Sequence, residues 1–179
     1  MGTQNNKFIF TDMKKLSLTV FLLFFIVSAF AQTDSTSQTP YLRFPTPPPV
    51  RLLLTDSVTY FTKENLNKKT AVMYVLFNPD CDHCKKETED ILENITKFKD
   101  IQIIMATFMP FNMMKEFYKT FNLSKYSNIV VGQDVNYFLP PFYKASYLPF
   151  LAFYNKKHEL ISVFQGSLSV PKILAEFDK

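Results

Sequence analysis

Two apolar runs in the middle of the chain, residues 71–77 and 101–107, enclose a segment with a different periodicity. Each run is an almost unbroken series of apolar side chains, as expected for strands that are covered on both faces of a sheet. Between them, apolar residues recur at helical spacing with charged residues in the intervening positions. These positions are Cys84, Thr88, Ile91, Leu92, Ile95 and Phe98. The pattern predicts a strand–helix–strand unit with a right-handed crossover.

The segments next to this unit extend the prediction in both directions. A short strand is predicted at residues 58–61, followed by a helical turn at residues 64–66. Beyond the second long strand, phenylalanine, tyrosine and methionine recur at helical spacing over residues 111–121 and predict a second helix.

In the last third of the chain, the apolar residues follow the shorter repeat that is typical of strands. Residues 150–154 and 160–164 have the composition of strands, and the polar residues between them predict a hairpin turn. Gly166 is expected to end the second strand of the hairpin. A closing helix is predicted around residues 173–177, with Pro171 tolerated in its first turn. The order β-α-β-α followed by β-β-α predicts an α/β protein.

The N-terminus has the features of a secretory signal peptide. Basic residues after Met13 precede a short apolar run that ends in Ala-Phe-Ala, a small-x-small cleavage signature, before Gln32. We therefore predict that residues 1–31 comprise an upstream extension and a signal peptide, and that the mature protein begins near Gln32. This predicts an exported, periplasmic protein. An uncleaved signal segment that anchors the chain in the membrane is the alternative.

A polar and proline-rich leader is predicted at residues 32–56, before a folded domain at residues 57–179. Residues 40–50 contain five prolines, which favour an extended polyproline conformation. Such a segment either separates the domain from a membrane or packs over the domain surface. A proline-recognition motif is a third interpretation.

The charge balance argues against nucleic-acid binding. Without residues 1–31, the chain keeps 17 of its 20 basic residues and 15 of its 16 acidic residues. This near balance gives no support for nucleic-acid binding. The whole chain has only three glycines, which excludes a glycine-rich phosphate-binding loop. The aromatic content of 16% matches a densely packed core.

Candidate chemistry is concentrated in residues 78–87, which contain both cysteines of the chain and one of its two histidines. Cys81 and Cys84 could form a metal site, a static disulfide or a working dithiol. A structural zinc site needs four ligands, usually from two cysteine or histidine pairs. Only His158 remains elsewhere, in the predicted hairpin turn. We therefore predict neither a metal nor an organic cofactor.

The order of elements over residues 57–179 resembles the thioredoxin fold. Cys81 and Cys84 lie where the first long strand meets its helix, and Leu148-Pro149 directly precedes the hairpin. The motif Cys-x-x-Cys-Lys-Lys-Glu is most similar to the TlpA/ResA group of envelope thiol–disulfide oxidoreductases. This resemblance implies a central mixed β-sheet flanked by helices. It also implies that Pro149 follows a cis peptide bond and faces the dithiol.

Several residues depart from the family pattern. Asn78, Pro79 and Asp80 stand where many relatives have aromatic residues, and the chain has no tryptophan. Val75 occupies the position of a buried acidic residue in cytoplasmic thioredoxins. A resemblance to peroxiredoxins would require a threonine three residues before the reactive cysteine, where this chain has Asn78.

The helical pattern also assigns chemical roles to the two cysteines. Cys81 is expected at a helix N-terminus, where unpaired N–H groups and the helix dipole stabilise a thiolate. Such a thiolate is the attacking group at neutral pH. Cys84, one turn further along and more buried, would resolve the mixed disulfide.

Two neighbouring residues could tune the dithiol. His83 would add positive charge near Cys81, or else would be an exposed residue that pairs with Glu87. Asp80 is expected to cap the helix N-terminus.

Glu87 is the one carboxylate that borders the apolar stripe of this helix. It lies about 60° from Cys84 on the helical wheel, whereas the other charged side chains of the segment point toward solvent. Partial desolvation would raise its pKa and let it exchange protons with Cys84 near neutral pH. Glu87 also matches the glutamate of the TlpA/ResA-like motif. The alternatives are a solvated acid in the first turns of the helix or a partner of His83.

These features together predict a thiol–disulfide oxidoreductase that exchanges disulfides with envelope proteins. Its partners would be protein thiols and disulfides, including a protein that donates or accepts its electrons. The alternative is a secreted thioredoxin-fold binding module with a static disulfide. A working dithiol is readily reduced, whereas a structural disulfide resists reduction.

Overall fold

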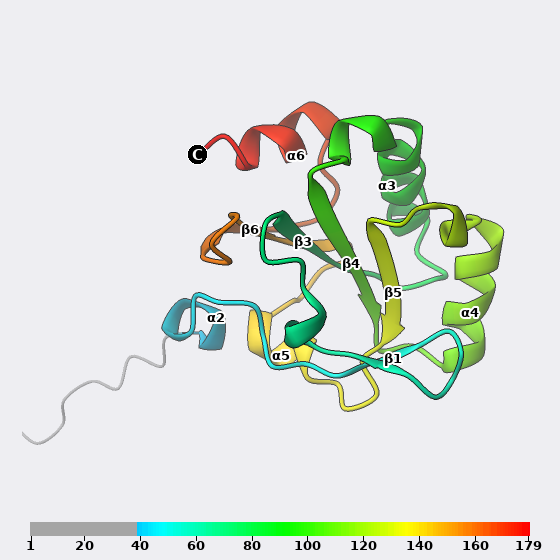
Figure 1. Cartoon of the computed structure of the whole chain (residues 1–179). Coiled ribbons are helices and arrows are strands. Elements are labelled where there is room, and N and C mark those ends of the chain that lie inside the picture. The colour runs from blue at the N-terminus through cyan, green and yellow to red at the C-terminus, as the bar shows by residue number, and fades with distance from the viewer. Residues whose placement is uncertain (1–38) are drawn as a thin grey trace, which may run out of the picture. The chain divides into compact units, whose positions relative to one another are not determined.

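A seven-stranded mixed sheet forms the centre of the protein, with the strand order β2-β1-β5-β4-β3-β6-β7 (Figure 1). The computed structural model describes residues 39–179. The three central strands β5, β4 and β3 are parallel, and the four outer strands pair antiparallel. The strands are β1 (Leu52–Leu54), β2 (Tyr60–Phe61), β3 (Ala71–Leu76), β4 (Ile101–Thr107), β5 (Ile129–Gln133), β6 (Phe150–Tyr154) and β7 (Leu160–Gln165).

Helices lie on both faces of the sheet. One face packs against α3 (Asp82–Glu93), α4 (Phe111–Thr120) and α6 (Val170–Glu176). The other face is covered by α5 (Leu139–Tyr143) and by chain from the N-terminal part of the domain. Short helical segments complete the fold, at α2 (Pro40–Arg43), η1 (Lys63–Asn65), η2 (Ile95–Phe98) and η3 (Leu123–Lys125).

Strand β3 shows why the first long apolar run is unbroken. Its side chains alternate between the two faces: Met73 and Val75 pack into the core beside α3, whereas Val72 and Tyr74 pack into the opposite core. All six residues of β3 are buried. A strand at the centre of a sheet with two covered faces has no solvent-facing position, so an apolar residue is favoured at each one.

The predicted thioredoxin-like architecture is confirmed in its main elements. The strand–helix–strand unit, the helix over residues 111–120, the hairpin and the closing helix all form as expected. Gly166 follows the last residue of β7, with a left-handed φ of 103°. His158, in the hairpin turn, also has a positive φ of 61°.

Several elements were not predicted from the sequence, among them β5, α5 and β1. Strand β5 contains Gly132, which interrupts its apolar run and weakens the strand signal. The glycine is required by packing, because a Cβ at this position would lie 2.6 Å from Leu52 Cβ on β1. The contact with Leu52 thus requires a glycine at a position where glycine's low strand propensity argues against a strand.

The compact unit begins at Thr39, earlier than the domain boundary predicted at residue 57. Strand β1, within the predicted leader, pairs with both β2 and β5. Residues 40–50, which we call the proline-rich segment, pack over the domain surface, with Pro47 and Pro48 buried. The Leu160 N–H donates a hydrogen bond to the Pro45 carbonyl at 2.8 Å. The extended conformation predicted for this segment is wrong at its start, where α2 forms.

The predicted signal peptide at residues 1–31, its cleavage before Gln32 and the first part of the leader lie outside the described residues. Among residues 39–179, no helix has the length and apolar character needed to span a membrane.

Candidate active site

The dithiol follows the carboxyl end of β3. The Asp80 N–H donates to the Asn78 side-chain oxygen at 3.0 Å, and the Cys81 N–H donates to the Asn78 carbonyl at 3.0 Å. Asn78 therefore fixes the turn that leads from the strand into α3. Cys81 is itself the N-cap of α3, and its carbonyl accepts the Lys85 N–H at 3.0 Å. The prediction that Asp80 caps the helix is wrong, because the turn at Asn78 leaves Asp80 exposed and outside the helix.

Pro149 lies beside Cys81, as expected. Strand β6 is antiparallel to β3, with Phe150 opposite Leu76, so the residues before β6 lie next to the residues that follow β3. The Leu148–Pro149 peptide bond is cis. Cys81 Sγ lies 3.9 Å from the Leu148 carbonyl oxygen. The dithiol and the proline loop, 67 residues apart in the chain, thus form one site.

The loop before Pro149 is held by the side chain of Gln165 at the end of β7. Its amide oxygen accepts the N–H groups of Ser146 at 2.8 Å and Tyr147 at 3.1 Å. These bonds fix the backbone just before Leu148. The Tyr147 ring is 73% exposed beside the site.

Cys84 is buried in the core between the sheet and α3, with 1% of its surface exposed. Its carbonyl accepts a hydrogen bond from the Thr88 hydroxyl at 2.8 Å. Burial, reinforced by the contact with Cys81, raises the pKa of the Cys84 thiol to about 12. Cys81, by contrast, is half-buried, and both cysteines are free thiols in this structure. The two sulfurs therefore have the unequal exposure expected of an attacking and a resolving cysteine.

Glu87 is also buried, with 2% of its surface exposed. Its Oε2 accepts the backbone N–H of Leu168 at 3.1 Å, whereas its Oε1 has no hydrogen-bond partner within residues 39–179. Burial raises the pKa of Glu87 to about 7, although the Leu168 N–H and the nearby Ser167 hydroxyl lower it. The predicted desolvation beside the apolar stripe is confirmed, and the alternative of a solvated acid is wrong.

His83 does not join this cluster. It is exposed on the first turn of α3 and forms no hydrogen bond or ion pair with Glu87, whose carboxylate is directed toward the loop at Leu168. The alternative pairing of His83 with Glu87 is therefore wrong. A tuning role for His83 through its charge stays a prediction.

Other parts of the site were not recognised in the sequence. Asn78 and Gln165 shape the loops around the dithiol, and the β7–α6 loop at Ser167 and Leu168 contacts Glu87. The position of Asn78 two residues before Asp80 is a local signal for a side-chain-to-backbone turn. The contact from Leu168 to Glu87 spans 81 residues and has no local signal. Within the described part of the chain, no three side chains of His, Cys, Asp or Glu are grouped to hold a metal ion.

No family model and no curated protein matches the sequence. The fold is nevertheless similar to solved structures. A secreted disulfide oxidoreductase of Mycobacterium tuberculosis, homologous to E. coli DsbE, matches with a TM-score of 0.60 at 12% identity, over 73% of this chain and 95% of that chain. StoA from Bacillus subtilis matches with a TM-score of 0.55 at 17% identity, over 74% of this chain and 98% of that chain.

A reduced 2-Cys peroxiredoxin from Plasmodium vivax is similar as well, with a TM-score of 0.57 at 14% identity, over 72% of this chain and 88% of that chain. At these identities the likeness shows the fold: the protein has a thioredoxin-like fold, and its structural neighbours include a secreted disulfide oxidoreductase. Because peroxiredoxins share this fold, the chemistry must be argued from the site residues.

The burial of Glu87 predicts a pH-dependent stability. Because its pKa is raised from 4.5 to about 7, the folded state holds the proton more tightly than the unfolded state does. This stabilisation is complete below the unfolded pKa and is lost as the pH rises through about 7. The loss is on the order of 3 kcal/mol. Glu87→Gln should remove it when unfolding by denaturant is compared at about pH 4 and about pH 8.

Glu89→Gln is the matched control, since Glu89 is an exposed acid on the same helix. This variant should keep the pH dependence of the wild type. Equal pH dependence in the wild type and in Glu87→Gln would contradict the raised pKa.

Proposed function

We propose that the protein is a thiol–disulfide oxidoreductase that exchanges disulfides with proteins of the cell envelope. One observation carries the proposal: the half-buried Cys81 caps α3 with its sulfur 3.9 Å from the carbonyl of Leu148, and the buried Cys84 lies one turn behind it. The attacking sulfur is thus accessible at a helix N-terminus beside a loop that can receive a substrate backbone. The resolving sulfur is protected from solvent.

The first step forms a mixed disulfide. The Cys81 thiolate attacks one sulfur of a substrate disulfide, and the other substrate sulfur leaves as a thiolate. Unpaired N–H groups in the first turn of α3 stabilise the Cys81 thiolate before the attack. Cys84 remains a neutral thiol during this step, because burial keeps its pKa near 12.

Cys84 completes the exchange. In the mixed disulfide, Cys81 no longer carries the thiol that helps to raise the pKa of Cys84. The Cys84 thiol passes its proton to the Glu87 carboxylate as its sulfur attacks the sulfur of Cys81. The bond from Cys81 to the substrate breaks, and the second substrate sulfur leaves as a thiolate. The substrate disulfide has then gained two electrons, and the dithiol has lost two in forming the Cys81–Cys84 disulfide.

The position of Pro149 supports a protein substrate. Proline has no N–H group with which to pair a neighbouring strand, so an extended substrate segment can approach the backbone at Leu148. The Leu148 carbonyl lies against the attacking sulfur. A substrate cysteine held by this loop would therefore be held next to Cys81.

The proposed location in the envelope rests on the sequence and on the neighbours. The N-terminal segment has the pattern of a signal peptide, and the M. tuberculosis neighbour is a secreted disulfide oxidoreductase. Disulfide exchange suits such an oxidising compartment. The partners would be envelope proteins with exposed disulfides or thiols, together with a protein that resets the dithiol.

Trapping of the mixed disulfide tests the proposal. Cys84→Ser lacks the resolving sulfur, so incubation of the reduced variant with insulin should yield a stable mixed disulfide through Cys81. Cys81→Ser is the matched control and should form at least about tenfold less adduct at neutral pH, because the remaining thiol is buried and has a pKa near 12. The adducts are measured on non-reducing gels and by mass spectrometry. Equal trapping by both variants, or by neither, would contradict the assignment.

A second experiment tests Glu87 as the proton acceptor. Glu87→Gln should slow resolution of a preformed Cys81 mixed disulfide by about tenfold to a hundredfold, the range of a positioned general base. The wild-type rate should rise with pH through about 7, where Glu87 loses its proton, and the variant should lack this rise. Stopped-flow release of the substrate thiol measures both. Glu89→Gln should match the wild type. If the rate and pH profile of Glu87→Gln are also unchanged, Glu87 takes no part in proton transfer.

A further inference from the structure

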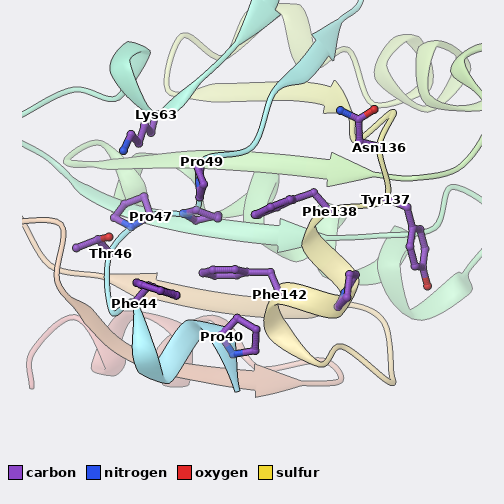
Figure 2. Close-up of a pocket in the computed structure, with 12 residues that line it drawn as sticks. Pro40, Phe44, Thr46, Pro47, Pro49, Lys63, Asn136, Tyr137, Phe138 and Phe142 are labelled. Carbon is purple, nitrogen blue, oxygen red and sulfur yellow. The ribbon is translucent and has the colours of Figure 1, made fainter. Parts of the chain in front are cut away.

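The sheet face opposite the dithiol contains a pocket of about 720 Å³ (Figure 2). This face is covered by the five-residue helix α5 and by the proline-rich segment. The dithiol belongs to the other face, because Cys84 packs into the core beneath α3. The pocket is therefore separate from the site described above. Its volume lies within the range of about 300–1,000 Å³ that is typical of small-ligand sites.

The walls of the pocket are aromatic rings and prolines. Phe138 and Phe142 on one side are stacked, with ring centroids 5.6 Å apart and an interplanar angle of 23°. Pro47 and Pro49 form another side, and Phe44 faces the same space while 56% exposed. Figure 2 shows these rings around a common gap. Rigid rings lose little conformational entropy when a ligand binds, so the pocket is prepared for an apolar group.

One end of the pocket is polar and positively charged. Within residues 39–179, Lys63 is the only charged residue in the lining, and no acidic residue contributes to it. Figure 2 shows Lys63 and Thr46 on either side of Pro47, at the same end of the pocket. The backbone that carries Lys63 is fixed, since the Thr62 N–H donates to the Asn65 side-chain oxygen at 2.8 Å. A second cation lies against a wall residue of the pocket, with the Arg43 guanidinium 5.4 Å from the centroid of the Phe44 ring.

We propose that this pocket binds a single-chain amphiphile with a carboxylate head, such as a fatty acid. The apolar chain would lie between Phe44, Phe138 and Phe142, and the carboxylate would lie at the end that carries Lys63. Lys63 and the lack of acidic side chains among the described lining residues favour an anionic head over a cationic one. This site is independent of the dithiol and adds a ligand-binding function to the protein.

Calorimetric titration of the reduced protein with decanoate and with 1-decanol, each below its aggregation limit, tests the site. Decanoate should bind at one site per chain and more tightly than 1-decanol, which lacks the charged head. Lys63→Glu should weaken decanoate binding by about fivefold or more and leave 1-decanol binding unchanged, because only the charged head contacts this residue. Lys68→Glu is the matched control, since Lys68 is exposed but lies outside the pocket; it should change neither affinity.

The apolar wall is tested by Phe44→Ser. Phe44 is more than half exposed, so this variant should fold, as checked by circular dichroism. It should weaken the binding of both decanoate and 1-decanol several-fold. In a separate comparison, octanoate should bind the wild type more weakly than decanoate, by up to about fourfold per methylene. The proposal is overturned if decanoate does not bind saturably, or if Lys63→Glu and Lys68→Glu have equal effects. Insulin trapping by Cys84→Ser should be unchanged by Lys63→Glu, so failure here leaves the dithiol assignment intact.

Discussion

The burial of two ionisable groups beneath the first turns of α3 is the constraint on which the proposed chemistry depends. Cys84 and Glu87 are one turn apart, and both lie in the core formed by α3 and the sheet. Desolvation raises both pKa values, but with different results. The thiol of Cys84 is neutral at physiological pH, whereas the carboxyl group of Glu87 titrates near pH 7. A single physical effect thus accounts for both groups to which we assign roles in the proposed exchange, Cys84 as resolving sulfur and Glu87 as proton acceptor.

The remaining parts of the site depend on how the sheet brings distant segments together. Because β6 starts opposite the end of β3, the Leu148–Pro149 loop lies beside Cys81. Strand β7 contributes Gln165, which fixes that loop, and the chain then turns back to donate the Leu168 N–H to Glu87. The hairpin and the loop after it therefore contact the surroundings of Cys81 through Gln165 and the carboxylate of Glu87 through Leu168. Changes in the hairpin should alter both.

Some parts of the fold and of the candidate site could be predicted from the sequence, and others could not. Helical periodicity alone placed Glu87 at the border of the apolar stripe, because burial on a helix depends on position along its own sequence. The prediction of the capping residue was wrong, since the turn at Asn78 makes Cys81 the N-cap of α3 in place of Asp80. Strand β5 was not predicted because Gly132 weakens the local strand signal. The glycine is needed there because Leu52, on a strand distant in sequence, approaches closely. Local periodicity thus identified Glu87, and the family resemblance pointed to Cys81, Cys84 and Pro149, whereas the residues that support this site depend on long-range contacts.

The reduction potential of the Cys81–Cys84 pair tests the central claim most directly. Equilibration with glutathione or dithiothreitol buffers, followed by alkylation and mass spectrometry, measures the fraction of reduced protein at each potential. A working dithiol should titrate between about −120 and −270 mV, the range of thioredoxin-fold oxidoreductases. A potential below about −300 mV, as found for structural disulfides, would contradict the account and indicate a static crosslink.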